Sequence, residues 1–230
     1  MPEVIKIANC SGFYGDNLSI AKKMVEGGPI DFLTGDYLAE LTMTILYYQK
    51  IKRGENQGYV GTFLKQFRDV AKLCNDQKIK IVSNAGGLNP ASMAAEVENI
   101  IKELNLDLKV AYIDGDDLMP RLDELSSSGE KLKNIDKNND LFSYEKKPLT
   151  ANAYLGAWGI KEALDNGADV VICPRVTDAA VVIGPAAWKF NWSRNDYDQL
   201  AGALAAGHII ECGAQATGGN YSFFKEVPTF

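Results

Sequence analysis

Five short segments of this sequence combine turn-forming residues with polar side chains, each directly after a stretch typical of a β-strand. They are Cys10-Ser11-Gly12, Thr34-Gly35-Asp36, Asn84-Ala85-Gly86-Gly87, Asp114-Gly115-Asp116 and Arg175-Val176-Thr177-Asp178. The carboxyl ends of parallel strands emerge at one edge of a sheet, where helix N-termini also point their amide groups. A single glycine after a strand only indicates a turn. The recurrence of five such segments predicts a shared ligand site at one sheet edge.

Three aspartates of these segments, Asp36, Asp114 and Asp178, are the candidate metal ligands. Carboxylate oxygens are the ligands that Mg²⁺ and other hard divalent ions prefer. A carboxylate in such a site also serves as a general base, and we assign that catalytic role to Asp36 and Asp178. The structural alternative is that each aspartate caps a helix or closes a turn. The expected cofactor is Mg²⁺ or another divalent metal.

Cys10 and Ser11 are candidate nucleophiles, which is the alternative to metal-assisted chemistry, because both follow the first expected strand at the same sheet edge. A cysteine near a helix amide end gains thiolate character, although a small buried cysteine at a strand terminus is the simpler interpretation. His208 is the only histidine of the chain and is a candidate general base. The alternative for His208 is a structural role at a helix C-terminus, where positive charge is favourable.

Arg175 is the candidate anion ligand, because it follows an apolar strand and a proline and is expected to project into the crevice. A salt bridge to a neighbouring aspartate is the alternative. Backbone amides and small polar side chains can hold a phosphate or an oxyanion. The other substrate-binding candidates are Ser11, Gly12, Asn84, Gly86, Gly87, Thr177 and Gln215.

The elements that must position these residues are short β-branched runs that alternate with longer amphipathic stretches. Strands are expected at 4–8, 31–34, 80–83, 108–113 and 170–173, and helices at about 17–26, 37–52, 60–74, 90–104, 152–165, 176–192 and 197–206. In the 37–52 helix, Leu38, Leu41, Ile45 and Tyr48 share one face. Strand, crossover helix and strand in repetition imply parallel pairing. The predicted fold class is α/β, a doubly wound, mostly parallel sheet with helices on both faces, forming one domain over residues 1–230.

Two segments depart from this regular pattern. Residues 126–147 are rich in Ser, Lys, Asn and Asp, which predicts an exposed excursion. The 176–192 helix carries Trp188, Phe190 and Trp192 near its end, a concentration of aromatic residues that a second copy or a further C-terminal segment would cover. The alternative is that all three pack internally under the final helix. The expected partners therefore include a homo-oligomer or a C-terminal partner segment.

Composition excludes several classes of protein. The formal net charge of −6 argues against nucleic acid, whose phosphates need a basic face. No apolar run approaches the length of a membrane span, so no membrane is expected. The four cysteines are widely spaced and form no CxxC pair, which favours a reducing cytoplasm over a disulfide framework.

Several motifs in one order resemble the N-terminal domain of the acyclic terpene utilisation AtuA family. They are the segments 9–16, 33–40, 83–90 and 175–179 and the glycine-rich 211–219, and the likeness spans nearly the whole chain except 126–147. Typical members of the family are longer, so the resemblance leads us to expect the N-terminal part of a longer family architecture, either a truncated chain or one half of a split protein.

The resemblance implies an enzyme of acyl-CoA or branched carboxylic acid catabolism. The implied reaction is carbon–carbon lysis of a branched 3-hydroxyglutaryl-CoA analogue from acyclic terpene breakdown, and the implied partner is a small anionic substrate such as an acyl-CoA. The alternatives are a hydrolase or acyl transferase that uses Cys10 or Ser11, and a non-catalytic domain that binds a metabolite or completes a complex. The resemblance carries over no established catalytic residue.

Overall fold

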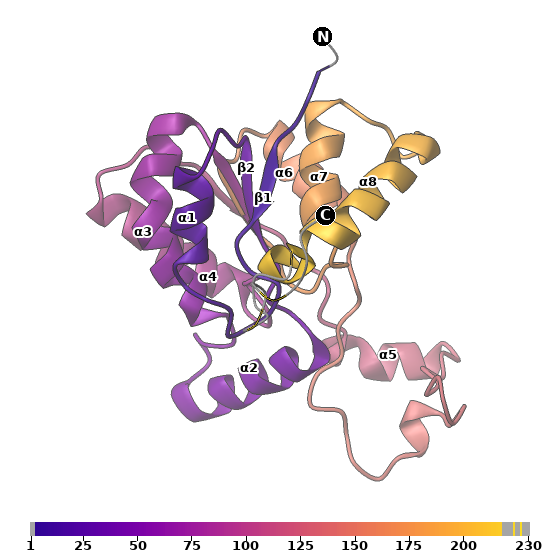
Figure 1. The fold of residues 1–230 in the computed structure, drawn as a ribbon. Helices are drawn as coiled ribbons and strands as arrows, with labels where there is room; N and C mark the ends of the chain where they lie inside the picture. Colours follow the sequence, from indigo (N-terminus) through magenta and orange to yellow (C-terminus); the bar gives the residue numbers. More distant parts are fainter. Residues whose placement is uncertain (1–2, 218–222, 224–225, 227–230) are drawn as a thin grey trace.

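The computed structural model describes residues 3–217, 223 and 226, and its centre is a parallel sheet of five strands (Figure 1). The strands are β1 (Ile7–Asn9), β2 (Phe32–Gly35), β3 (Lys80–Ser83), β4 (Val110–Tyr112) and β5 (Val170–Ile172). Their order across the sheet is β1-β2-β3-β5-β4, and every neighbouring pair is parallel. The predicted α/β fold class is confirmed.

Helices cover both faces of this sheet. The helices α1 (Ile20–Glu26), α3 (Gly61–Gln77) and α4 (Pro90–Glu103) pack on one face, and α6 (Trp158–Asp165), α7 (Ala180–Lys189) and α8 (Tyr197–Ile210) lie on the other (Figure 1). Side chains alternate along each strand, so neighbouring residues enter different cores. Leu33, Ile81 and Ile172 join the core under α1, α3 and α4, called the first core here. Phe32, Val82 and Val171 join the second core, on the opposite face of the sheet. The apolar run of β5 is thus buried on both faces, as its sequence predicts.

Local signals in the sequence set the start of α4. The Asn89 side chain accepts a hydrogen bond from the Ser92 amide, and Pro90 opens the helix. A side chain that caps the free amides and a proline with a helical φ together fix this boundary.

The helix expected from residue 152 begins only at Trp158. Residues before it are extended, because Asn152 forms an antiparallel bridge with Asp117 and Leu155 forms a parallel bridge with Val176. Pairing with two loops at the end of the sheet satisfies the backbone groups that a helix would otherwise have satisfied. This strap brings Tyr154 to the carboxyl edge of the sheet.

The helix α2 (Glu40–Arg53) lies outside the two layers, below the carboxyl ends of the strands (Figure 1). It buries Met43 and Leu46. Leu38, predicted on the same face as Leu41, Ile45 and Tyr48, instead precedes the helix and is buried. The other three share one face, as their spacing predicts, but that face is exposed to solvent.

The polar excursion is exposed, as predicted. It follows the short helix α5 (Leu122–Ser127) and projects beside α2 (Figure 1), and Ile135 within it is almost completely exposed. The three aromatic residues at and just after the end of α7 are each partly buried. Trp188 packs edge-on against Phe32, and Phe190 stacks on Trp192. Among the described residues, no helix has the length and apolar character needed to cross a membrane.

Candidate functional site

Asp36 lies at the carboxyl end of β2 and is held there by the neighbouring strand. Its carboxylate Oδ1 accepts hydrogen bonds from the Asn84 side chain at 2.5 Å and from the Leu38 amide at 3.3 Å. The Oδ1 of Asn84 in turn accepts from the Tyr37 amide at 2.8 Å. The Tyr37 ring crosses Gly35 so closely that a side chain at Gly35 would meet it at 2.7 Å. The glycine therefore lets the chain turn sharply and direct Asp36 to the sheet edge.

The surroundings of Asp36 favour its protonated form. Burial removes the carboxylate from water and raises its pKa to about 8, with Asp178 and Glu211 adding to the shift through their like charge. The hydrogen bond from Asn84 opposes the shift but is outweighed. A carboxyl group with a pKa near neutrality can both accept and donate a proton at physiological pH.

Glu211 follows α8 and is fixed over the end of β1. The Asn9 side chain donates to the backbone carbonyl of Glu211 at 2.5 Å, and Asn9 accepts from the Thr34 hydroxyl at 2.9 Å. A Cβ at Gly12 would overlap the Cys212 carbonyl, so only glycine allows the two segments to approach this closely. These contacts join the first and last parts of the described fold at the site.

Asp178 enters the site from the loop after β5. It pairs with Arg175, whose Nη1 lies 2.8 Å from Asp178 Oδ1. The Arg175 guanidinium stacks over the Tyr154 ring at 3.9 Å, and the Tyr154 hydroxyl donates to Glu40 at 2.5 Å. Arg175 is only 4% exposed, and its Nε is buried without a hydrogen-bond partner among the described residues. The ion pair that the sequence offered as the alternative for Arg175 is therefore present.

Asp36, Asp178 and Glu211 converge at one point. One carboxylate oxygen from each lies within 4.8 Å of the others, which is the spacing of ligands around a single ion. Asp36 and Glu211 are buried, and the Asp178 side chain is 47% exposed. Arg175 supplies one positive charge to this group of three acids. The cluster therefore favours a cation, since carboxylates in proximity repel one another.

An open groove of about 470 Å³ lies beside the exposed member of the cluster. Asp178, Thr177 and His208 form its polar part, and Ala201, Leu204 and Ala205 of α8 form an apolar wall. A groove with an acidic end and an apolar wall suits a ligand that has a hydrogen-bond donor or a cation-bound group at one end and a hydrocarbon tail.

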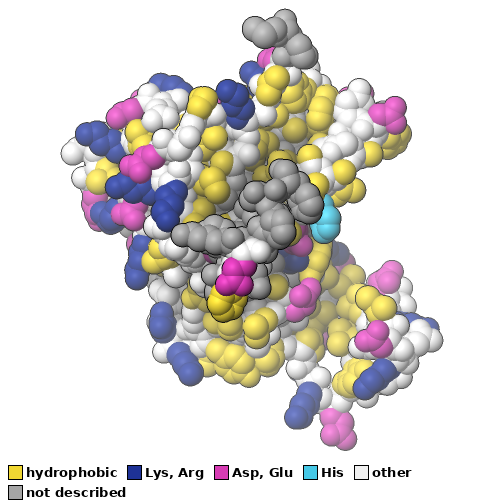
Figure 2. Space-filling model, viewed as in Figure 1, with side chains coloured by type: hydrophobic (Ala, Val, Ile, Leu, Met, Phe, Trp, Pro, Cys, Tyr) yellow, Lys and Arg dark blue, Asp and Glu magenta, His cyan; other side chains and the backbone are white. Residues whose placement is uncertain are grey.

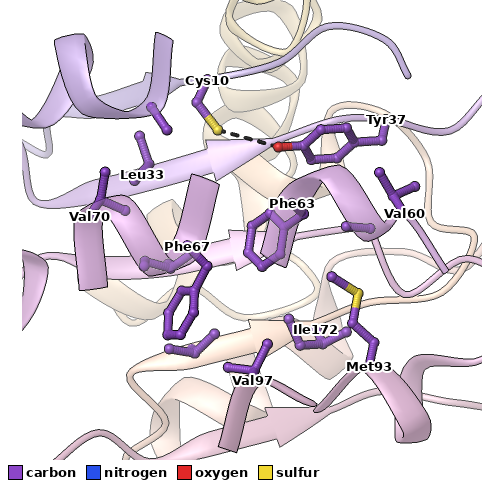
Figure 3. Close-up of a cluster of buried hydrophobic side chains, with 14 of the residues drawn as sticks. Cys10, Leu33, Tyr37, Val60, Phe63, Phe67, Val70, Met93, Val97 and Ile172 are labelled. Atoms are coloured by element: carbon purple, nitrogen blue, oxygen red, sulfur yellow. Dashed lines mark hydrogen bonds between the residues drawn. The ribbon is translucent and has the colours of Figure 1, made fainter. Parts of the chain in front are cut away.

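Cys10 and Ser11 have the surroundings of structural residues. The Cys10 side chain points into the first core, toward the Tyr37 hydroxyl at 3.7 Å (Figure 3). Burial raises the pKa of the Cys10 thiol to about 11, which disfavours the thiolate that a nucleophile requires. Ser11 is buried, and its hydroxyl donates to the Phe13 carbonyl. These contacts support the structural interpretation of both residues.

Gly86 and Gly87 shape a turn in this structure. The Gly86 amide donates to the Cys173 carbonyl and the Gly87 amide to the Asn84 carbonyl. Side chains at either position would overlap neighbouring atoms. Both amides therefore donate to acceptors within the protein, and neither is free to bind a ligand as predicted. Asn84, the third candidate of this loop, donates a hydrogen bond to Asp36.

Asp114 is exposed and is not a member of the carboxylate cluster. It follows β4, which is an edge strand. The loop after β4 reaches the site through Asp116 instead, whose carboxylate accepts from the Arg175 amide and the Asn152 side chain. Glu211 holds the position in the cluster that the sequence assigned to Asp114. Glu211 stands at the start of the glycine-rich 211–219 motif, and that was the signal available in the sequence.

The other predicted residues surround the cluster at different distances. His208 Nδ1 lies 3.9 Å from Glu211, and its side chain is 82% exposed. Thr177 is exposed at the groove, and Gln215 is exposed near Gly12. Gly218 and Gly219, which end the glycine-rich motif, lie outside the described residues.

Fold and site together define an all-parallel α/β protein with an acidic centre at the carboxyl edge of its sheet. The family model of the acyclic terpene utilisation family protein AtuA matches residues 5–230. The chain therefore belongs to the AtuA family, and its membership implies a role in acyclic terpene utilisation. No curated protein and no solved structure matches the chain.

Proposed function

We propose that this protein is a divalent-cation-dependent carbon–carbon lyase that acts on a branched 3-hydroxy acyl thioester, such as a 3-hydroxyglutaryl-CoA analogue formed in acyclic terpene breakdown. The observation that carries the proposal is the convergence of Asp36, Asp178 and Glu211 within 4.8 Å at the strand ends. Membership of the AtuA family supports the metabolic setting. The four unpaired cysteines fit a cytoplasmic enzyme.

Asp178 and Glu211 are the proposed ligands of the cation. Asp36 lies close enough to both for a bound cation to interact with its carboxylate electrostatically. Mg²⁺ and Mn²⁺ suit these two ligands because both donate carboxylate oxygens. A bound cation would polarise the carbonyl oxygen of the substrate. It would also offset the mutual repulsion that holds the pKa of Asp36 above its ordinary range.

Arg175 is the proposed ligand of the substrate carboxylate. Its Nε is buried and has no hydrogen-bond partner within residues 3–217, and stacking on Tyr154 fixes the plane of the guanidinium. Two parallel N–H donors of a guanidinium match the two oxygens of a carboxylate. The apolar wall of α8 would then receive the branched hydrocarbon portion of the substrate.

Asp36 is the proposed general base. It takes the proton of the substrate's 3-hydroxyl group, and the oxygen electrons form a carbonyl at C3. The C2–C3 bond breaks, and its electron pair moves to C2, which is protonated to give an acetyl unit. This step needs no oxidant, and the proton that Asp36 accepts can be returned to C2.

Turnover of a 3-hydroxy-3-methylglutaryl thioester, with MnCl₂ or with a chelator, tests this function. We expect an acetyl thioester and a 3-keto acid to form only when the cation is present. Asp178→Asn should abolish turnover, whereas Asp114→Asn, a carboxylate of the same sheet edge that lies outside the cluster, should leave it unchanged. Turnover that survives Asp178→Asn or complete chelation would contradict the proposal. Cation and ligand binding without any turnover would favour the non-catalytic alternative.

A further inference from the structure

The outward face of α2 is apolar along most of its length. Leu41, Ile45 and Tyr48 recur at the spacing of one helix side, and Ile51 follows one turn later. Their exposed fractions are 71%, 37%, 50% and 63%. Figure 2 shows hydrophobic side chains gathered at the bottom of the molecule, where α2 runs in Figure 1. A surface helix ordinarily turns one apolar stripe to the core, and α2 carries a second stripe toward solvent.

The ends of α2 carry opposite charges. Glu40 occupies the first turn, whereas Lys52 and Arg53 lie in the last turn. All three side chains belong to exposed residues. This distribution is self-complementary in one arrangement, in which two copies of the helix run antiparallel about a two-fold axis at the helix centre.

That arrangement pairs the first residue of one helix with the last residue of the other. Glu40 then meets the partner's Arg53, and Ile45 meets the partner's Tyr48. Leu41 meets the partner's Lys52, whose aliphatic stem can cover a leucine while its ammonium group stays in water. Apolar residues thus meet apolar residues in the middle, and opposite charges meet at both ends.

We propose that this face of α2, defined by Leu41, Ile45, Tyr48 and Ile51, is the contact surface of a two-fold homodimer of this chain. The helix has 14 residues and is about 21 Å long. Because the two-fold axis passes through the middle of the helix, its apolar face forms the centre of the interface. The proposal is independent of the proposed reaction. It bears on the site at one point, because Glu40 accepts the hydrogen bond of Tyr154, which stacks on Arg175.

Helix α8 also exposes apolar side chains, including Leu204 and Ile209. Leu204 and its alanine neighbours already line the groove beside the carboxylates. Asp198 lies in its first turn and His208 in its last turn, so its basic end is a single histidine, whereas α2 ends in Lys52 and Arg53. The charge pattern therefore favours α2 as the surface that a second copy covers, and α8 supplies a matched control.

Sedimentation velocity of the full chain, from about 1 to about 100 μM, tests the proposal over the range of ordinary homodimer affinities. We expect a concentration-dependent dimer. Leu41→Glu and Tyr48→Glu should each raise its Kd by roughly 30-fold or more, the effect of losing a central apolar contact. Both side chains are exposed, so the thermal midpoint of the monomer should change little. The control Ile209→Glu, an exposed isoleucine on α8, should leave the dimer intact.

Charge exchange tests the antiparallel arrangement. Glu40→Lys and Arg53→Glu should each weaken self-association, because like charges then face one another at both ends. An equimolar mixture of the two variants should form a heterodimer more readily than either variant forms a homodimer, since every end pair is again of opposite sign. A chain that is monomeric throughout, a dimer that survives both apolar variants, or a mixture with no preference for the heterodimer would overturn the proposal.

Discussion

Asp36→Asn should remove a specific part of the pH dependence of folding stability. The pKa of Asp36 is raised from 3.8 to about 8 by burial and by the charges of Asp178 and Glu211. Between about pH 5 and about pH 7 the folded chain therefore holds one proton that the unfolded chain has released. Stability from this residue is fully present below about pH 4 and is lost as the pH rises toward about 8. The slope is about 1.4 kcal/mol per pH unit, so the loss between about pH 5 and about pH 7 is of the order of 3 kcal/mol.

Urea unfolding at about pH 5, 6 and 7, with a chelator present, measures this term. The free energy of unfolding of the wild-type chain should fall by about 3 kcal/mol more than that of Asp36→Asn over this range. Asparagine keeps an oxygen to accept the Asn84 hydrogen bond, so Asp36→Asn should fold. The control Asp114→Asn alters an exposed carboxylate outside the cluster and should follow the wild type. Parallel pH profiles for wild type and Asp36→Asn would refute the reasoning.

Three further substitutions or deletions test how the site is supported. Gly12→Ala places a Cβ against the Cys212 carbonyl and should lower the free energy of unfolding by about 1–3 kcal/mol. Mn²⁺ binding should also weaken, because Glu211 next to Cys212 is displaced. Unchanged stability and affinity would show that the two segments are not in tight contact. Arg175→Lys loses the planar head group that stacks on Tyr154, so the free energy of unfolding measured in urea should fall by about 1–2 kcal/mol. An unchanged free energy of unfolding would show that the stacking is not stabilising. Deletion of residues 126–147 should change stability by less than Phe67→Ala, a core truncation that costs about 3–5 kcal/mol, and loss of cooperative unfolding after the deletion would contradict this expectation.

The fold could be predicted from the sequence because its elements carry local signals. The β-branched run of β5 is buried on both faces, and the Asn89-Pro90 pair marks the start of α4. The strap at 152–157 could not be predicted in this way, since its extended backbone depends on bridges to Asp117 and Val176. Such long-range pairing overrides the local preference for helix.

The candidate site was predictable only in part. Asp36 and Asp178 follow strands, so the parallel topology brings them together. Asp114 also follows a strand, but β4 lies at the edge of the sheet, two strands from β3. The order of strands in a sheet cannot be predicted from the local periodicity of the sequence. Glu211 follows a helix and reaches the cluster through the Asn9 contact and the close approach at Gly12, which only the folded chain shows.

Calorimetric titration of the chain with MnCl₂ at about pH 7, in two buffers of different ionisation enthalpy, tests the central claim that Asp178 and Glu211 hold a cation beside Asp36. With a pKa of about 8, Asp36 is mostly protonated at this pH, so cation binding should release close to one proton. Asp178→Asn and Glu211→Gln should abolish binding, Asp36→Asn should bind without releasing the proton, and Asp114→Asn should behave as the wild type. Absence of binding, or binding that Asp178→Asn and Asp114→Asn affect equally, would contradict the account.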